Sequence, residues 1–186
     1  MNTGTRPRQR LSGDTFSTLL HGWAAKTPDN EYLQIGGGWL TYAEVAERTD
    51  QLAAGLQELG LRKGDHLGFL LTNRIEFALT YFACSRIGVV MVPLVPYLRG
   101  SFLRHQLVDS DAVALLTDAQ GVAQIEGLEP PKLRDVIVVG DVDVEALPSS
   151  SVRTASRLAR WRSHAARAAL GASMPAASRS WQNSMR

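Results

Sequence analysis

The chain has 186 residues, of which 45% are hydrophobic and 20% charged, so it can bury a sizeable core and is not expected to be disordered throughout. A single cysteine, Cys84, excludes a disulfide framework and a cysteine-based zinc site and fits a reducing compartment. The formal net charge of +2 hides an acidic body between two basic ends, because all 18 acidic residues lie between Gly13 and Ser150.

The chain is expected to begin with a basic flexible arm over residues 1–13. This arm contains three arginines but lacks the apolar segment of a secretory signal. Four apolar residues then recur at the i, i+3, i+4, i+7 spacing of an amphipathic helix, namely Phe16, Leu19, Leu20 and Trp23. Pro28 is expected to stop this helix.

A short hairpin and a long helix are predicted next. Glu31–Ile35 and Trp39–Thr41 flank three glycines, Gly36–Gly38, which suit a hairpin turn. Thr41 and Glu44 form an S/T-x-x-E capping box, in which each side chain accepts a hydrogen bond from a backbone N–H of the first turn. Apolar residues continue at helical spacing for about five turns. Gly60 is expected to end this helix in a left-handed conformation.

Four short apolar runs then alternate with helical stretches. The runs begin at His66, Val89, Ala112 and Val136, and the stretches between them are Arg74–Ile87, Ser101–Ser110 and Ala119–Gly127. Apolar runs without polar alternation, joined by crossovers of this length, are typical of parallel strands that are buried on both faces. We therefore predict an α/β body over residues 14–148, with a doubly wound, mostly parallel sheet.

The first of these helical stretches carries two further signals. Asn73 is expected to cap it, and Gly88 is expected to end it. Because the stretch is apolar on most sides, we expect it to be buried. The longest apolar run, residues 87–98, contains two prolines and is shorter than the ~20 residues that a transmembrane helix needs. A cytoplasmic protein without a membrane segment is expected.

No phosphate-binding loop or metal site is expected. The sequence holds neither G-x-x-x-x-G-K-[ST] nor G-x-G-x-x-G after a predicted strand. Gly36–Gly38 has no helix N-terminus behind it, so a turn is favoured over a phosphate cradle. No two histidines lie with a carboxylate within one helical turn, as metal binding usually requires.

A few reactive side chains are interpreted as structural. His105 and Asp109 stand four residues apart, as a base and its orienting carboxylate could, but no nucleophile stands at a recognisable spacing and a solvated pair is favoured. His66 follows Asp65 at the start of a strand and is expected at the surface. Cys84 lies on the apolar helix and is expected to be a buried, inert thiol.

The composition changes abruptly near Ser149. The last 36 residues contain nine alanines, seven serines and seven arginines, with too few large aliphatic side chains to offset the entropy of ordering. We expect residues 149–186 to be a disordered tail, or a segment read out of frame. A basic amphipathic helix that contacts an anionic membrane or a nucleic acid is the weaker alternative; its members would be Arg153, Arg157, Leu158, Arg160, Trp161 and Leu170.

Several short strings in the body occur in one characteristic order. They are Leu40–Val45, Gly60 with Lys63–Asp65, Asn73, Gly88 with Pro93, Leu94 and Pro96, and the series Leu103, Leu107, Ser110 and Leu115. This ordered set resembles the N-terminal segment of the adenylate-forming (AMP-binding) superfamily, in its acyl-CoA synthetase or acid–CoA ligase branch. The resemblance covers about Phe16 to Gly140, and it points more weakly to fatty acid metabolism.

The resemblance implies an incomplete N-terminal subdomain of an adenylate-forming enzyme. Enzymes of this superfamily use ATP and Mg²⁺ to convert a carboxylic acid into an acyl-adenylate, and then pass the acyl group to a thiol, usually that of CoA. The family's phosphate loop, nucleotide-binding stretch and C-terminal lid have no counterpart in this sequence. The resemblance therefore assigns no catalytic, cofactor-binding or metal-binding residue here, and the chain itself is expected to hold no cofactor.

We favour a truncated or frame-shifted synthetase-like protein that is inactive alone, because GC-rich codons read out of frame give an Ala-, Arg- and Ser-rich sequence. The complete enzyme would bind a carboxylic acid, ATP and CoA. One alternative is a stand-alone α/β module whose basic tail contacts a membrane or a nucleic acid. Another is a partner that docks on a full-length synthetase.

Overall fold

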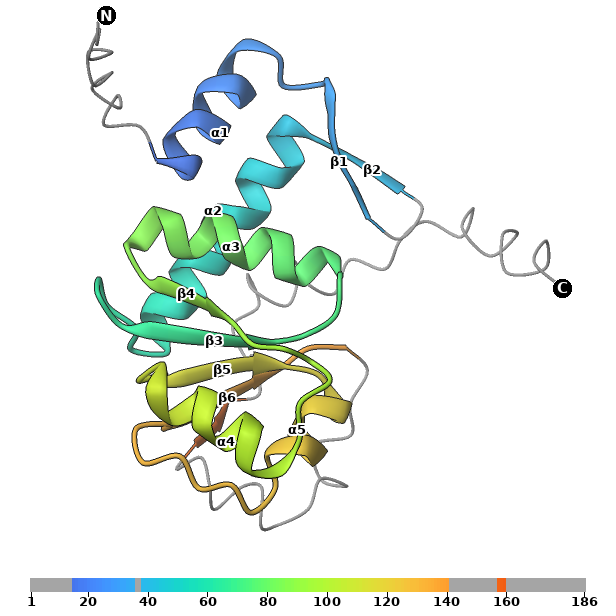
Figure 1. Ribbon diagram of the computed structural model, residues 1–186. Helices are drawn as coiled ribbons and strands as arrows, with labels where there is room; N and C mark the ends of the chain where they lie inside the picture. Colours follow the sequence, from blue (N-terminus) through green and yellow to red (C-terminus); the bar gives the residue numbers. More distant parts are fainter. Residues whose placement is uncertain (1–14, 36–37, 141–156, 160–186) are drawn as a thin grey trace, which may run out of the picture.

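The computed structural model of the chain describes residues 15–35 and 38–140, and the backbone of residues 157–159. The expected arm over residues 1–13, the turn at Gly36–Gly37 and nearly all of the expected tail lie outside the described residues. The elements run in the order α1 (Phe16–Lys26), β1 (Glu31–Ile35), β2 (Gly38–Thr41), α2 (Tyr42–Glu58), β3 (His66–Leu70), α3 (Ile75–Ile87), β4 (Val90–Pro93), α4 (Gly100–Asp109), β5 (Ala114–Thr117), α5 (Ala119–Ile125), β6 (Asp135–Val138) and β7 (Arg157–Ala159) (Figure 1).

The predicted parallel sheet is confirmed. Its strands lie in the order β4-β3-β5-β6-β7, and every neighbouring pair is parallel. The predicted hairpin is also confirmed, because β1 and β2 pair antiparallel in a separate two-stranded sheet. Strand β7 is the described part of the tail, and it extends the sheet beyond β6. Disorder in the rest of the tail stays a prediction.

Helices cover both faces of the five-stranded sheet, as the doubly wound prediction requires. Helices α2 and α3 lie on one face, and α4 and α5 lie on the other (Figure 1). Strand side chains alternate between the two layers, so that Phe69 joins the cluster under α2 and α3, whereas Leu70 joins the cluster with α4 and α5. We call these clusters the α2–α3 core and the α4–α5 core.

The signals predicted for the ends of helices α2 and α3 are mostly confirmed. The N–H of Glu44 donates to Thr41 Oγ1 over 3.2 Å, and the N–H of Thr41 donates to Glu44 Oε2 over 2.8 Å, which completes the capping box of α2. Gly60 after α2 and Gly88 at the end of α3 have φ values of +104° and +74°. A Cβ at position 88 would also lie 2.8 Å from Lys63 Cγ, so the Lys63 side chain would have to shift to accept another residue there.

One prediction for α3 was wrong, and another is confirmed only in part. Asn73 does not cap the helix, because the N-cap residue is Arg74, which makes no capping hydrogen bond and instead binds Glu76 through its guanidinium group. The helix is buried in part, as expected, and Arg86 is its one exposed residue. Leu79 and Cys84 are buried, but the remaining large apolar side chains of α3 are only half-buried: Ile75, Phe77, Tyr81, Phe82 and Ile87.

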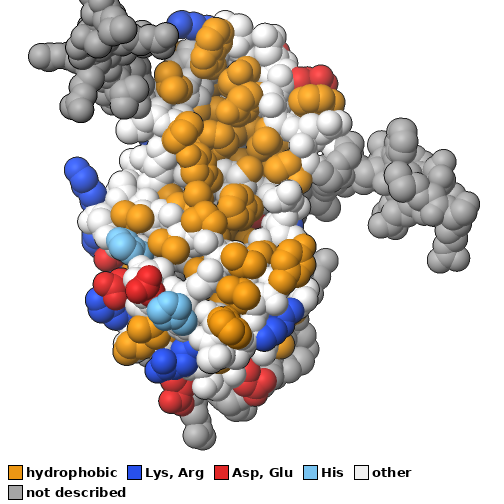
Figure 2. All heavy atoms as spheres, viewed as in Figure 1, with side chains coloured by type: hydrophobic (Ala, Val, Ile, Leu, Met, Phe, Trp, Pro, Cys, Tyr) orange, Lys and Arg blue, Asp and Glu red, His pale blue; other side chains and the backbone are white. Residues whose placement is uncertain are grey.

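The stripe predicted for α1 forms a helix, but only Leu20 of that stripe is buried. Large apolar side chains also stay exposed in and after β4. Figure 2 shows apolar side chains gathered along the face of the molecule that carries α1 and α4. We call the exposed large apolar side chains of α1 and of residues 90–102 the apolar band, which consists of Phe16, Leu19, Trp23, Val90, Val95, Tyr97 and Phe102.

Candidate functional site

The carboxyl edge of a doubly wound sheet binds ligands at the point where the strand order reverses. In this sheet that point lies between β3 and β5, because the chain leaves β3 toward β4 on one side and returns to β5 on the other. The segment after β3 carries Arg74 and Glu76, and the residue after β5 is Asp118. This edge is therefore the candidate site.

The guanidinium group of Arg74 joins the two segments. Its Nη2 and Nε atoms lie 3.2 and 3.3 Å from the two carboxylate oxygens of Glu76, and its Nη1 lies 3.8 Å from Asp118 Oδ2. The Glu76 side chain is only 9% exposed, and the Arg74 side chain is 35% exposed. Gly140 after β6 lies beside this cluster, since a Cβ there would lie 3.4 Å from Arg74 Nη2. The buried carboxylate of Glu76 is thus compensated by a half-buried cation.

Close backbone packing fills the space beside this cluster. The buried hydroxyl of Thr117 donates to the carbonyl oxygen of Leu70 over 2.9 Å and ties the ends of β3 and β5 together. Asp118 Oδ1 accepts from the N–H of Gly121 over 3.0 Å and caps α5. Gly121 is needed for this approach, because a Cβ at that position would lie 1.7 Å from Thr117 Oγ1. Contacts within the chain therefore hold this edge of the sheet in place.

These residues do not fit the phosphates of a nucleotide. Arg74 already binds two carboxylates, and the first turn of α5 is capped by the carboxylate of Asp118, so a phosphate would meet negative charge instead of unpaired donors. Within residues 15–35 and 38–140, no three His, Cys, Asp or Glu side chains are grouped so that they could hold a metal ion. The arrangement can position the loops of the sheet edge.

The side chains that the sequence singled out do not meet at this edge. His105 and Asp109 lie exposed on α4, and no hydrogen bond joins them in the described structure. Cys84 is buried as predicted, and burial raises the pKa of its thiol to about 12. His66, expected at the surface, is only partly exposed, and its Nδ1 lies 2.6 Å from the carbonyl oxygen of Ser110.

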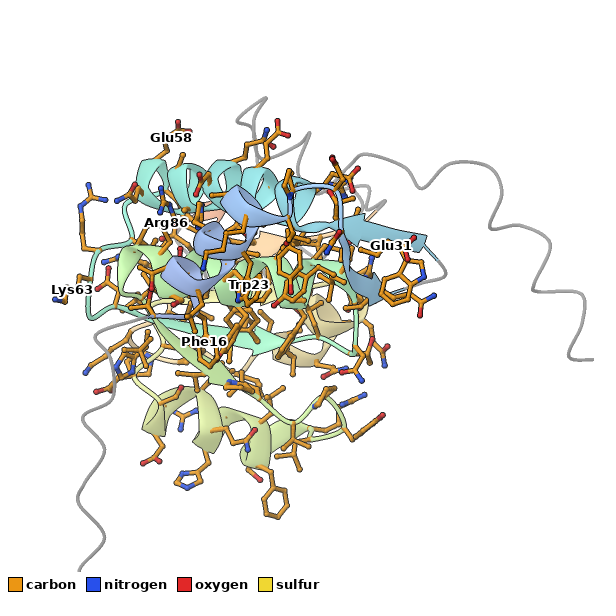
Figure 3. The ribbon with its side chains drawn as sticks, turned by 90° about the horizontal axis from the view of Figure 1, so that it is seen from above. Phe16, Trp23, Glu31, Glu58, Lys63 and Arg86 are labelled. Atoms are coloured by element: carbon orange, nitrogen blue, oxygen red, sulfur yellow. The ribbon has the colours of Figure 1, made fainter. Side chains whose placement is uncertain are left out.

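A second polar cluster joins the three helices α1, α2 and α3. His21 Nε2 lies 3.0 Å from Asp50 Oδ1, and the same oxygen lies 2.6 Å from Arg86 Nε. Figure 3 shows Arg86 beside α1 and α2. Sequence reasoning missed this cluster because its members are far apart along the chain. The only local signal is the i, i+4 spacing of Ser17 and His21.

This cluster resembles a Ser-His-Asp arrangement only superficially. Ser17 Oγ lies 3.5 Å from His21 Nδ1, but that nitrogen is 2.7 Å from the carbonyl oxygen of Ser17, to which it donates. Ser17 is also only 2% exposed, so a substrate could not reach its hydroxyl. The cluster therefore acts as a structural clip that holds α1 to α2 and α3.

Comparison with known proteins gives one matching family. The model of that family, described as AMP-binding enzyme, matches residues 20–177. The match begins within α1 and continues past the boundary expected near Ser149. No helix in the described part of the chain is long and apolar enough to cross a membrane.

Individual relatives match the same region. Salicyl-AMP ligase / salicyl-S-ArCP synthetase of Mycobacterium tuberculosis is 34% identical over 142 residues, which cover 70% of this chain and 25% of the relative. Feruloyl-CoA synthase of Amycolatopsis sp is 35% identical over 120 residues, which cover 64% of this chain and 24% of the relative. This chain thus spans about a quarter of the length of the curated relatives it matches.

Among solved structures, the N-terminal domain of FACL13 from Mycobacterium tuberculosis has a similar fold. The two superpose with a TM-score of 0.63 at 22% identity, over 76% of this chain and 36% of the FACL13 domain. The matched part of the present fold therefore corresponds to only about a third of that domain.

Proposed function

The chain belongs to the AMP-binding enzyme family, and from that premise we propose that it is the N-terminal scaffold segment of a ligase that activates a carboxylic acid with ATP. The family match over residues 20–177 carries this proposal, together with the quarter of each relative that the chain spans. In this role the two cores and the fastened edge around Arg74 provide a rigid frame for parts of the ligase that lie elsewhere.

In the complete ligase, the carboxylate of the acid would attack the α-phosphorus of ATP and release pyrophosphate, and a thiol would then take the acyl group and release AMP. Catalysis of such steps depends on donors and a metal that stabilise charge at the phosphates. Because the edge around Arg74 and Asp118 does not fit phosphate, we propose that the chain alone catalyses neither step. A cytoplasmic location is part of the same proposal, and the single cysteine supports it.

The acid activated by the complete ligase is proposed to be aromatic. The two relatives named above carry salicyl and feruloyl groups in their names, and both exceed 30% identity. Their names differ in the thiol, which is ArCP for one and CoA for the other, so the proposal extends to the acid only. A fatty acid is the second candidate, from the weaker sequence resemblance.

Acid-dependent ATP–pyrophosphate exchange tests this proposal. The purified chain should give no exchange with salicylate, ferulate or palmitate. The full chain joined ahead of the part of the salicyl-AMP ligase that follows its matched 142 residues should give exchange with the aromatic acids. Magnesium-dependent exchange by the chain alone, above a boiled control, would show that it is an active short enzyme.

A separate test concerns the proposed truncation. The other two reading frames of the gene beyond the codon of Ser150 can be translated and searched for a Ser-Gly-Thr-Thr-Gly-like string. Its presence would support a frame-shifted synthetase gene. An unrelated gene in that position would favour the stand-alone module or the docking partner.

A further inference from the structure

The apolar band brings two separate stretches of the chain onto one face. Phe16, Leu19 and Trp23 come from α1, and the other members come from residues 90–102. Tyr97 and Phe102 are 81% and 71% exposed, which is far more than the half-exposure common to the α1 members. Exposed apolar side chains that gather in this way mark an interaction surface.

The α1 part of the band does not suit a membrane surface. Helices that lie on anionic membranes carry several Lys or Arg residues on their polar face. Helix α1 has a single cation, Lys26, whose ammonium group lies 5.4 Å from the centre of the Trp23 ring. An apolar protein surface is therefore the better match for the α1 part of the band.

The β4 part of the band does not suit the addition of another strand. β4 is the edge strand of the described sheet. The N–H groups of Val90 and Leu94 donate to the carbonyl oxygens of Asp65, just before β3, and of Phe69 in β3, so the backbone of Met91 and Pro93 turns outward. Pro93 has no N–H to donate, which weakens pairing with a further strand. A partner on this side would pack through side chains.

We propose that the apolar band is the surface through which this chain packs against the remainder of an AMP-binding N-terminal domain. The inference rests on the proposed function. The chain covers only 36% of the FACL13 N-terminal domain, so most residues of that domain lie outside the matched part. When a domain is divided, the surface that was buried between its parts is as apolar as a core. The exposed Phe, Trp and Tyr side chains of the band have that character.

Cysteine labelling of the full chain tests this surface. Trp23→Cys and Phe102→Cys place a thiol on the band, and Glu58→Cys on the exposed end of α2 is the matched control. Figure 3 shows Glu58 at the edge of the view on the end of α2, apart from Phe16 and Trp23. The native Cys84 does not interfere, because it is 1% exposed and burial raises the pKa of its thiol to about 12. Leu19→Cys is a second variant for α1, because it leaves the stacking of Trp23 on Tyr42 intact.

Each variant is labelled in the free chain and in the chain joined ahead of the rest of the salicyl-AMP ligase. Packing excludes solvent, so joining should slow labelling at positions 23 and 102 by about tenfold or more and at position 58 by less than about twofold. Equal rates at positions 23 and 102 in the two proteins would overturn the proposal. Insolubility of the joined protein, when the native ligase is soluble, would also overturn it.

Two further outcomes would assign the band to another partner. Slower labelling of the free chain at rising protein concentration would indicate a second copy, and slower labelling with phosphatidylglycerol vesicles would indicate a membrane. Either result, without protection in the joined protein, would overturn the proposal. Labelling does not require turnover, so a protected band without pyrophosphate exchange would remove the proposed function and leave the docking surface standing.

Discussion

Helices α1 and α2 are built alike but lie in different surroundings. Both begin with a complete capping box, formed by Thr15 with Thr18 in α1 and by Thr41 with Glu44 in α2. Both carry apolar residues at helical spacing. The stripe of α2 is buried in the α2–α3 core, whereas most of the α1 stripe lies in the apolar band. The spacing of apolar residues therefore determines which way the apolar face of a helix points, and the neighbouring elements determine whether that face is buried.

Substitution of one leucine in each helix should give the largest difference in the free energy of unfolding. Leu52 of α2 is fully buried, and Leu19 of α1 is 48% exposed. Leu52→Ala should lower the free energy of unfolding by about 3 kcal/mol, because it removes buried methyl groups and leaves a cavity. Leu19→Ala should lower it by less than about 1 kcal/mol. Urea unfolding followed by circular dichroism measures both values, and equal losses would contradict an open face on α1.

The thiol of Cys84 tests how well the α2–α3 core is closed to solvent. Burial raises the pKa of this thiol from 9.0 to about 12, so the folded chain keeps a proton that the unfolded chain releases at lower pH. The contribution of Cys84 to stability is therefore full below pH 9 and is lost as the pH rises from there toward about 12, by up to about 1.4 kcal/mol per pH unit.

Comparison with Cys84→Ala isolates this effect from the other groups that titrate in the same range. Between about pH 8 and about pH 10.5, the stability of the native chain should fall relative to the variant by about 2 kcal/mol. Urea unfolding at both pH values measures the change. A difference between the two chains that does not depend on pH would show that the thiol is not as enclosed as the structure places it.

Local signals were sufficient to predict the fold of the body. The Thr41–Glu44 capping box and the left-handed Gly88 each depend on residues within one turn, and the apolar runs of the parallel strands need no distant partner to be recognised. Asn73 shows where such signals fail. A suitable capping residue stands before the helix, but the N-cap residue is Arg74, whose guanidinium group pairs with Glu76.

The candidate site could not be predicted in the same way. Arg74 and Asp118 meet only because β3 and β5 are neighbours, which requires the chain to return across β3 after β4. The clip of His21, Asp50 and Arg86 likewise depends on how three helices pack. Exposure of the α1 stripe was not predictable either, because the sequence pattern does not show which surfaces lack a neighbour.

Removal of the N-cap of each helix should give a smaller difference in the free energy of unfolding. Thr41→Ala should lower the free energy of unfolding by about 1 kcal/mol, because it removes a cap from a helix that is part of the core. Thr15→Ala removes the same interaction from α1, whose first turn can fray while the body stays folded. The free energy of unfolding of the whole chain should therefore fall by only a few tenths of a kcal/mol. Amide hydrogen exchange should instead become faster in the first turn of α1. Equal global losses would mean that α1 unfolds together with the body.

His21→Ala is expected to have the smallest effect, and it tests what holds α1 in place. The side chains of His21 and Asp50 are 29% and 44% exposed, so solvent screens their contact and the loss in global stability should be about 0.5 kcal/mol or less. Asp50 keeps its contact with Arg86 in the variant, so α2 and α3 remain joined. The clip fastens a helix that buries little of its apolar face, and exchange should therefore become faster along α1 and stay unchanged in α2. His105→Ala on the exposed surface of α4 is the matched control and should change neither helix. A uniform increase in the exchange rates of α1 and α2 would show that the two helices unfold as one unit. They would then differ only in how far their apolar side chains are exposed.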